Sequence, residues 1–556
     1  MKKVRLLSLL SVTALVTTVL VTAPTVANAA PACDGKSPIQ SCVGVTSDGA
    51  PYAMQVPANF NGTVALYSHG YRYNVDIPAA IPLIGGYKIT NTPEPVPGGN
   101  AEVAKYFFSQ GIAIVGSGFA RQGWNPDSAI KTNVELIDTF KKQFPKTTKV
   151  VAWGSSLGGV ITQGLAEKHP ELVSAVAPMC MADNVSAELT MAGDFLWGIK
   201  VLFDPTIKAG NYSAGAAGVA ESYADLVKVF TVMGKLQASI STGAWPDTSS
   251  ATGKALQAAG IPSRSALLLL GLMAGLPTQS AHFDSISGPD GALKLTFPLA
   301  ISPVLAILEN GTNAAALAVL ATQDVENQTG GAIFDNTKTD YAARLGSDLY
   351  TYGSALSGLD AASGMLAYLS PLNPAAPRVA GNAKAIEKMR ALASHIGKIN
   401  VPTITLGAVA DNATPAGHDQ WLGDRAAEQL TAARAAAKAA YLTSGSYTKP
   451  VSKFMSIWQK TPAKYSKYTA TGAPDTTPAT ANGTGHCNTT PAQNLAIADL
   501  AYEAANTGAD YLIVTCPKCL THFNCYIKIK FSSNLRSQSV YFPIKIVLQL
   551  IPNSVM

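Results

Sequence analysis

Charged residues are scarce in this chain of 556 residues: lysine, arginine, aspartate and glutamate make up only 14% of it. An ordinary soluble protein has about 25%. Hydrophobic residues make up 47%, so the chain can bury a core. Wholesale disorder is excluded, because it requires low hydrophobicity together with high net charge. The length allows more than one compact unit, since domains usually span about 100–200 residues.

Signatures of several other protein classes are absent. Gly116-Ser117-Gly118 does not complete the G-x-G-x-x-G of a dinucleotide loop, and no phosphate-loop lysine is present. We find no internal repeat. Beyond residue 29, no segment reaches the roughly 18 uninterrupted apolar residues of a membrane span. The longest apolar run, residues 266–276, is typical of a buried helix. No cofactor and no stable membrane anchor are therefore expected.

The formal net charge of +6 at pH 7 does not belong to the body of the chain. Residues 1–29 and residues 515–556 contain basic residues and no acid, whereas the segment between them has slightly more acids than bases. A basic excess confined to the two ends gives no support to a nucleic-acid partner.

The N-terminus has the layout of a secretory signal peptide. A positive start with Lys2, Lys3 and Arg5 precedes an apolar run, and Ala27-Asn28-Ala29 then offers a cleavage site. A membrane anchor is the alternative, but the run is short for a bilayer span and no charged stop follows it. We expect a secreted, extracellular protein whose signal peptide, residues 1–29, is cleaved near Ala29.

Strands and helices alternate over the first third of the remaining chain. This alternation indicates an α/β fold with a mostly parallel sheet flanked by helices on both faces. Strands are expected at Thr63–Ser68, 112–116, 149–153 and 173–179, and helices at 100–110, at 127–144 with Asp127 as N-cap, and at Leu157–Lys168.

The alternation of strands and helices stops after residue 183 and resumes with a strand expected over residues 401–406. The stretch between is helical and rich in glycine and alanine, which favours a large, mainly helical cap inserted into one core. The expected organisation is a first core part at 30–183, a cap at 184–398 and a second core part at 399–507. Helices are expected at 425–441 and 491–505 within the second part.

Residues 154–158 (GSSLG) carry the sharpest chemical signal. The pattern is G-x-S-x-G, preceded by an expected strand and followed by an expected helix, which is the context of a nucleophile elbow. The glycines permit a tight turn that exposes the Ser156 hydroxyl. The helix N-terminus favours negative charge that develops there. The alternative is an ordinary glycine-rich turn with a capping serine.

A serine hydroxyl needs a base, and a base needs an acid to orient it. His486 lies in a glycine-rich loop near the end of the regular chain, where a loop-borne base is expected, and His418 is a second possibility. The acid should follow the strand at 401–406, and Asp411 does so. Asp419 and Asp183 remain alternatives to Asp411.

The Ser156, Asp411, His486 order and the His69-Gly70-Tyr71 motif resemble the α/β-hydrolase superfamily, in particular secreted bacterial serine esterases and lipases. The resemblance covers residues 60–183 and 399–507. It implies an oxyanion hole formed by the backbone N–H of Leu157 and by that of Tyr71, although the first loop departs from the HGGG form of some lipases. It also implies a structural role for His69.

Export implies an oxidising compartment, so cysteines are disulfide candidates. Cys33 and Cys42 are nine residues apart and favour a local loop. In the fold that the resemblance implies, Cys180 and Cys487 follow strand ends on the same side of the sheet. A bridge between them would hold the His486 loop against the core. Tannase- and feruloyl-esterase-like hydrolases tie this loop in a similar way, from a different partner position. The alternative is a free, buried Cys180.

Residues 508–556 form an atypical basic tail. From residue 515 it has neither acids nor alanine, and three of the seven cysteines of the chain fall between residues 516 and 525. Cys516, Cys519, His522 and Cys525 are spaced more tightly than usual structural zinc ligands, so no metal is expected. We favour a translated frameshift or read-through past the natural end, and a genuine extension with an exposed β segment is the alternative.

Together these features predict a serine hydrolase that cleaves carboxylic esters through an acyl-enzyme. The substrate would be a small-molecule or polymer-derived ester. A peptidase on the same scaffold shares the chemistry, with an acyltransferase as a lesser variant, and a non-catalytic binding protein would keep the fold alone. Several apolar cap residues are expected to roof the pocket: Phe195, Trp197, Trp245 and residues 267–270.

Overall fold

The computed structural model describes residues 30–35, 38–283, 301–392, 395–461 and 483–507. The expected signal peptide and the basic tail with its cysteine and histidine cluster lie outside the described residues.

A single sheet of nine strands forms the centre of the core, in the order β1-β2-β3-β5-β4-β6-β7-β8-β9. Strands pair antiparallel from β1 through β3 to β5, and parallel from β5 to β9. The strands are β1 (Ala32–Cys33), β2 (Ile39–Val45), β3 (Pro51–Pro57), β4 (Thr63–Ser68), β5 (Ala113–Ser117), β6 (Lys149–Ser155), β7 (Ala175–Met179), β8 (Thr403–Ala408) and β9 (Phe454–Gln459).

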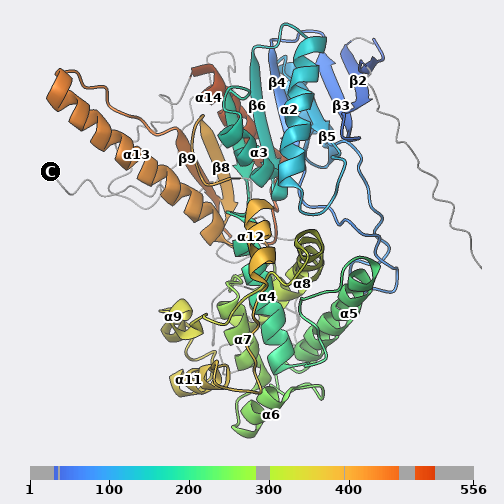
Figure 1. Ribbon diagram of the computed structural model, residues 1–556, viewed down its shortest axis with the longest axis vertical. Coiled ribbons are helices and arrows are strands. Elements are labelled where there is room, and N and C mark those ends of the chain that lie inside the picture. Colours follow the sequence, from blue (N-terminus) through green and yellow to red (C-terminus); the bar gives the residue numbers. More distant parts are fainter. Residues whose placement is uncertain (1–29, 36–37, 284–300, 393–394, 462–482, 508–556) are drawn as a thin grey trace, which may run out of the picture.

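Helices cover both faces of the sheet (Figure 1). Helices α2 (Pro126–Gln143) and α3 (Leu157–Lys168) lie on one face, and α1 (Ala101–Ser109) and α14 (Pro491–Thr507) on the other. Along β4, Val64 and Leu66 pack with the first pair of helices, whereas Ala65 and Tyr67 pack with the second pair. Because successive side chains of a strand point to opposite faces, a strand covered on both sides is apolar throughout. The expected fold class is confirmed.

The chain between β7 and β8 forms a helical layer below the sheet in Figure 1. One of its helices, α8, is long and apolar enough to cross a membrane, but 72% of its most apolar window is buried within the protein. That burial is the environment of a core helix. The helices of this layer are α4 (Val185–Leu202), α5 (Ala216–Ala238), α6 (Ala251–Ala258), α7 (Ser263–Met273), α8 (Ser302–Thr329), α9 (Tyr341–Leu345), α10 (Asp348–Thr351), α11 (Leu359–Tyr368) and α12 (Ala383–Leu392).

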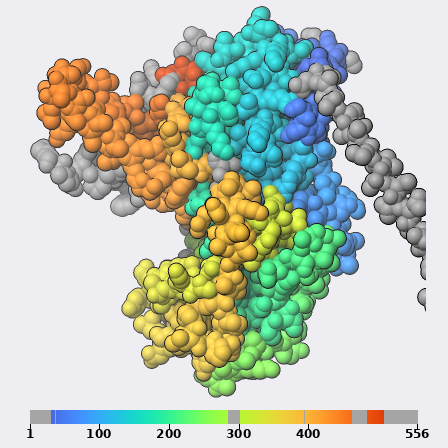
Figure 2. Space-filling view, in the orientation of Figure 1, coloured from blue at the N-terminus to red at the C-terminus, as the bar shows by residue number. Residues whose placement is uncertain are grey.

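Helix α13 (Ala416–Ser444) begins against β8 and β9 and then leaves the body of the protein, as the projecting orange helix in Figure 2 shows. Its first turns contain buried residues, including His418 and Asp419. The outer half is exposed and rich in alanine. Alanine has the highest intrinsic helix propensity, so this half can stay helical with little packing.

Most expected elements are present with ends shifted by one or two residues, but the helix expected at 425–441 begins well before residue 425, as α13 at Ala416. Helix α2 begins one residue earlier than expected: Asn125 is its N-cap, Pro126 occupies the first helical position, and Asp127 lies in the first turn. Proline is well suited to that position, because its missing N–H has no partner there. The sequence interpretation did not identify β1, β2, β3 or β9, which lie on the outer parts of the sheet.

Candidate active site

Ser156 lies in the turn between β6 and α3. Its backbone has φ 59° and ψ −128°, a conformation that a residue with a side chain adopts only when its surroundings impose it. The space around the turn is tight. A Cβ on Gly158 would collide with the carbonyl oxygen of Ser68, and a Cβ on Gly154 with that of Gly158. The two glycines of the motif are therefore required for close packing.

Ser156, His486 and Asp411 are connected by hydrogen bonds, although they are far apart in the sequence. His486 Nε2 lies 2.7 Å from Ser156 Oγ. His486 Nδ1 lies 2.9 and 3.1 Å from the two carboxylate oxygens of Asp411. Asp411 follows β8, and its Oδ1 also accepts the backbone N–H groups of Ala413 and Thr414, both at 2.9 Å. These backbone bonds fix the carboxylate before any ligand arrives.

Burial and charge shift the pKa values of Asp411 and His486 in opposite directions. Burial raises the pKa of Asp411, but the charge of His486 and its hydrogen bond outweigh burial and leave that pKa below its ordinary value. Burial lowers the pKa of His486, and Asp411 reverses this and raises the pKa above its ordinary value. The carboxylate of Asp411 is thus charged at neutral pH and stabilises a protonated imidazole.

The alternative partners from the sequence analysis lie elsewhere. Asp183 Oδ1 is 2.8 Å from Nδ1 of His418 rather than beside His486. Asp419 is buried, and neither of its carboxylate oxygens has a hydrogen bond in the part of the chain that the structure describes. Burial and the neighbouring Asp411 raise the pKa of Asp419 to about 7.

The loop of His486 is fastened to the core by a disulfide. Cys180, which directly follows β7, is bonded to Cys487, with 5.6 Å between their Cα atoms. The backbone N–H of Cys487 also donates to Asp411 Oδ2 at 2.9 Å. The ligand atoms of Cys180, Asp411 and Cys487 lie within 4.8 Å of one another, but both sulfurs are engaged in the disulfide, so the group does not fit a metal.

A second disulfide joins Cys33 and Cys42, which face each other across the β1–β2 pair. Both bridges are those expected from the sequence. Disulfides persist in oxidising environments, so they fit an extracellular protein.

The motif His69-Gly70-Tyr71 lies beside Ser156. A Cβ on Gly70 would be 3.3 Å from the Cβ of Ser156. His69 is buried, and its Nδ1 lies 2.8 Å from the carbonyl oxygen of Gly70. Burial and the nearby Arg72 lower the pKa of His69 to about 4. Within the described residues, the N–H groups of Tyr71 and Leu157 donate to no backbone carbonyl.

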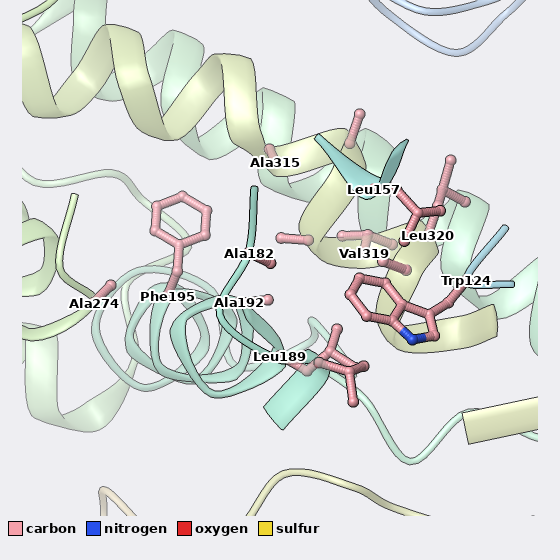
Figure 3. Close-up of a cluster of buried hydrophobic side chains, with 14 of the residues drawn as sticks. Trp124, Leu157, Ala182, Leu189, Ala192, Phe195, Ala274, Ala315, Val319 and Leu320 are labelled. Carbon is pink, nitrogen blue, oxygen red and sulfur yellow. The ribbon is translucent and has the colours of Figure 1, made fainter. Parts of the chain in front are cut away.

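A pocket opens at Ser156 and His486. Its empty space is about 710 Å³, a figure that includes the part open to solvent. Figure 3 shows a cluster of buried apolar side chains from α4, α8 and the core, part of which lines the pocket: Trp124, Leu157, Ala182, Leu189, Ala192 and Phe195. The lining includes Trp124, Leu157, Leu189, Ala192, Phe195 and Leu317. Tyr71, Ser156, Glu188, Thr414 and His486 supply its polar groups.

The position of Trp124 in this wall is fixed by an acid of the helical layer. Asp324 on α8 has a fully buried side chain, pairs with Arg121 and accepts the backbone N–H of Trp124 at 2.7 Å. Its Oδ1 also accepts from Asn74 Nδ2 at 2.8 Å. A Cβ on Gly123 would collide with the Asp324 carboxylate. Asp324 thereby joins α8 to the loop of residues 121–124 at the edge of the pocket.

The expected roof of the pocket is partly wrong. Phe195 lines the pocket, but Trp197 and Trp245 do not. Trp197 stacks on Tyr341 and donates to a backbone carbonyl, and Trp245 packs on Phe203. The leucines at 267–270 are buried inside the helical layer. Helix α7 is apolar all round, so it is buried on every side within the helical layer instead of facing the site with one stripe.

Sequence analysis did not single out Glu188, Trp124 or Asp324. One signal was available for Glu188, which is the only acid in the first turn of the mostly apolar helix α4. For Trp124 and Asp324 we find no such signal, because their contact joins segments 200 residues apart.

The strand order, the turn at Ser156 and the positions of Asp411 and His486 after later strands define an α/β-hydrolase fold. No family model matches the sequence, and no curated protein matches it.

Among solved structures the chain is similar to feruloyl esterase B from Aspergillus oryzae (14% identity, TM-score 0.31, 71% of this chain and 69% of that chain). It is also similar to another esterase from Aspergillus oryzae (12%, 0.31, 71% and 68%). An esterase from Pyrococcus furiosus matches a smaller part (12%, 0.20, 27% and 56%). At these values the fold assignment rests on the topology described above.

Proposed function

We propose that this protein is a secreted serine hydrolase that cleaves carboxylic esters through Ser156, His486 and Asp411. The observation that carries the proposal is the hydrogen-bonded chain from Ser156 Oγ through His486 to Asp411 at an apolar pocket. Nucleophile, base and orienting acid are the parts that acyl transfer requires. Signal-peptide cleavage near Ala29 and the division into 30–183, 184–398 and 399–507 remain part of this proposal.

In the proposed reaction, Ser156 Oγ bonds to the ester carbonyl carbon while its proton moves to His486 Nε2. The N–H groups of Leu157 and Tyr71 would donate to the oxyanion, because they lie on the two segments that flank Ser156. The bond from carbon to the alcohol oxygen then breaks, and His486 returns the proton to that alcohol. Water repeats the sequence on the acyl-enzyme and releases the acid.

Ester cleavage is favoured over the alternatives by the lining of the pocket. The wall is mostly apolar, which suits the acyl or alcohol part of an ester. A peptidase would use the same three residues, so the substrate must be tested directly. A non-catalytic binding protein has no need for a hydrogen-bonded Ser–His–Asp chain.

Fluorophosphonate labelling tests the nucleophile. The folded protein should be modified at Ser156, and the Ser156→Ala variant should resist labelling. A panel of p-nitrophenyl esters beside aminoacyl anilides tests the substrate class. Failure of the wild-type protein to label would favour the binding protein, and turnover of the anilides alone would favour the peptidase. The intact mass of the exported protein would test both the cleavage near Ala29 and the presence of residues 515–556.

A further inference from the structure

Glu188 places a carboxyl group in the mostly apolar wall of the pocket. It stands in the first turn of α4 and lines the same pocket as Ser156 and His486. Its side chain is 13% exposed. Oε1 is buried without a hydrogen-bond partner in the described part of the chain.

Burial without a hydrogen bond makes this an expensive position for a carboxyl group. Leaving a buried polar group unpaired costs about 1–3 kcal/mol, and nearly all buried polar groups in native proteins have a partner. The neighbouring positions on α4, such as Leu189 and Ala192, are apolar.

His418 lies within ion-pair distance of Glu188. Its Nε2 lies 3.7 Å from Glu188 Oε1, too far for a hydrogen bond, and its Nδ1 lies 2.8 Å from Asp183. Burial lowers the pKa of His418, but Glu188 and Asp183 outweigh it and raise the pKa to about 9. Burial raises the pKa of Glu188 to about 7, with His418 opposing the shift. At neutral pH a protonated His418 therefore offsets much of the negative charge of Glu188.

We propose that Glu188 binds a hydroxyl group of the ester substrate and selects for hydroxylated esters. This inference rests on the proposed esterase function and names its substrate class. The carboxylate would accept a hydrogen bond from the hydroxyl group, and a hydrogen bond is what Glu188 Oε1 lacks in the free protein. A site with an unpaired buried polar group rejects the analogue that lacks the matching group more strongly than an apolar wall can.

A hydroxyl group fits better than an ammonium group. An ammonium ion needs a full, uncompensated negative charge, and here His418 already stands beside the carboxyl group. A neutral hydroxyl places no further charge into an apolar pocket, and burying a charge there is far more costly.

The test compares matched esters on the full-length protein. One pair, p-nitrophenyl 3-hydroxybutyrate and p-nitrophenyl butyrate, differs by a hydroxyl on the acyl part. A second pair, glyceryl monobutyrate and propyl butyrate, differs by hydroxyls on the alcohol part. The variants are Glu188→Leu, which removes all polar atoms, and Glu188→Gln, which keeps an acceptor. Glu428→Gln, an exposed acid on α13, is the control for loss of a negative charge.

The wild-type protein should prefer the hydroxylated member of at least one pair. Glu188→Leu should lower kcat/KM for that ester by about 10- to 100-fold, mainly through KM, and leave the other member unchanged or faster. Glu188→Gln should keep part of the preference, and Glu428→Gln all of it. The responding pair tells whether the hydroxyl is on the acyl or the alcohol part.

Equal loss on both members of each pair would assign Glu188 a structural role and overturn the proposal, as would the absence of any preference in the wild-type protein. If Glu188→Leu selectively abolished turnover of aminoacyl anilides, the group bound would be an ammonium. Failure of the proposed function looks different: the wild-type protein then cleaves no ester of either pair, whether or not Ser156 is labelled by the fluorophosphonate.

Discussion

The carboxylate of Asp411 meets Nδ1 of His486 with both of its oxygens, at 2.9 and 3.1 Å. The same carboxylate accepts backbone N–H groups from its own loop and from Cys487. One acid thus organises two loops that come from different ends of the second core part. Its substitution should disturb the imidazole more than the fold.

Asp411→Asn should lower kcat by about 10³- to 10⁴-fold. The amide must place its NH₂ group either against His486 Nδ1 or against backbone N–H donors, so the imidazole loses its orientation or its tautomer. Steady-state kinetics on p-nitrophenyl butyrate and the rate of fluorophosphonate labelling measure this. Asp419→Asn, at a buried acid without a hydrogen bond to His486, is the matched control and should stay within several-fold of wild type. Equal losses in the two variants would contradict the role of Asp411.

The dependence of activity on pH should report His486. His486 accepts a proton only when it is neutral, and Asp411 and Glu188 raise its pKa above the ordinary value of about 6.5 despite the opposing effect of burial. Activity should therefore fall as the pH drops through a value above about 6.5. Glu188→Gln removes a carboxylate that raises the pKa of His486, so the pH at which activity falls should be lower in this variant. The account would be contradicted if activity in the wild-type protein fell only below pH ~6, or if the variant lost activity at the same pH as the wild-type protein.

Removal of the Cys180–Cys487 bridge should lower kcat as well as stability. The bridge fastens the loop of His486, and Cys487 N–H helps to hold Asp411. A double alanine variant should lose about 2–5 kcal/mol in free energy of unfolding. Its kcat should fall by about 10- to 100-fold, because small displacements of a base have large effects.

The matched control is the double alanine variant of Cys33 and Cys42, whose bridge lies at the far edge of the sheet. It should keep kcat and lose less stability, because it closes a shorter loop. Denaturant unfolding and kinetics on the same samples distinguish the two bridges. If both variants lost kcat alike, the bridge near His486 would have no special role.

Asp324→Asn should loosen the wall at Trp124. In the wild-type protein, Arg121, Asn74 and the backbone N–H of Trp124 all donate to the Asp324 carboxylate. The NH₂ group of an asparagine cannot accept a hydrogen bond, so at least one of these donors would lose its acceptor. We expect a loss of about 1–3 kcal/mol in the free energy of unfolding. KM for esters should rise, because Trp124 lines the pocket.

The control for this variant is Asp247→Asn, which breaks an exposed pair with Lys235 in the same helical layer. Its unfolding free energy and its KM should both stay close to the wild-type values, because an exposed ion pair contributes little to stability. If the Asp324→Asn variant unfolded like wild type and kept its KM, the hydrogen bonds of Asp324 would not be what positions Trp124.

The strands and helices next to the site could be predicted because each carries a local signal. Strand β4 (63–68) and helix α3 (157–168) have the predicted bounds. The apolar run of β4 ends at the His69-Gly70-Tyr71 motif, and α3 begins directly after the turn at Ser156. Strand β9 was missed because only part of it is buried, which leaves a weak pattern. The helical layer was expected as a cap, but its interior could not be assigned.

Sequence alone determined the strand-to-helix turn at Ser156, because steric requirements on the glycines at 154 and 158 are local. It also limited the partners of Ser156 to a few histidines and acids. Only the tertiary structure placed Asp411, and not Asp419 or Asp183, in hydrogen-bond contact with His486, and only it brought Glu188 and Trp124 to the same pocket as Ser156. Those choices depend on distances between residues hundreds of positions apart, which are set by the packing of helices on the sheet and leave no periodic trace in the chain.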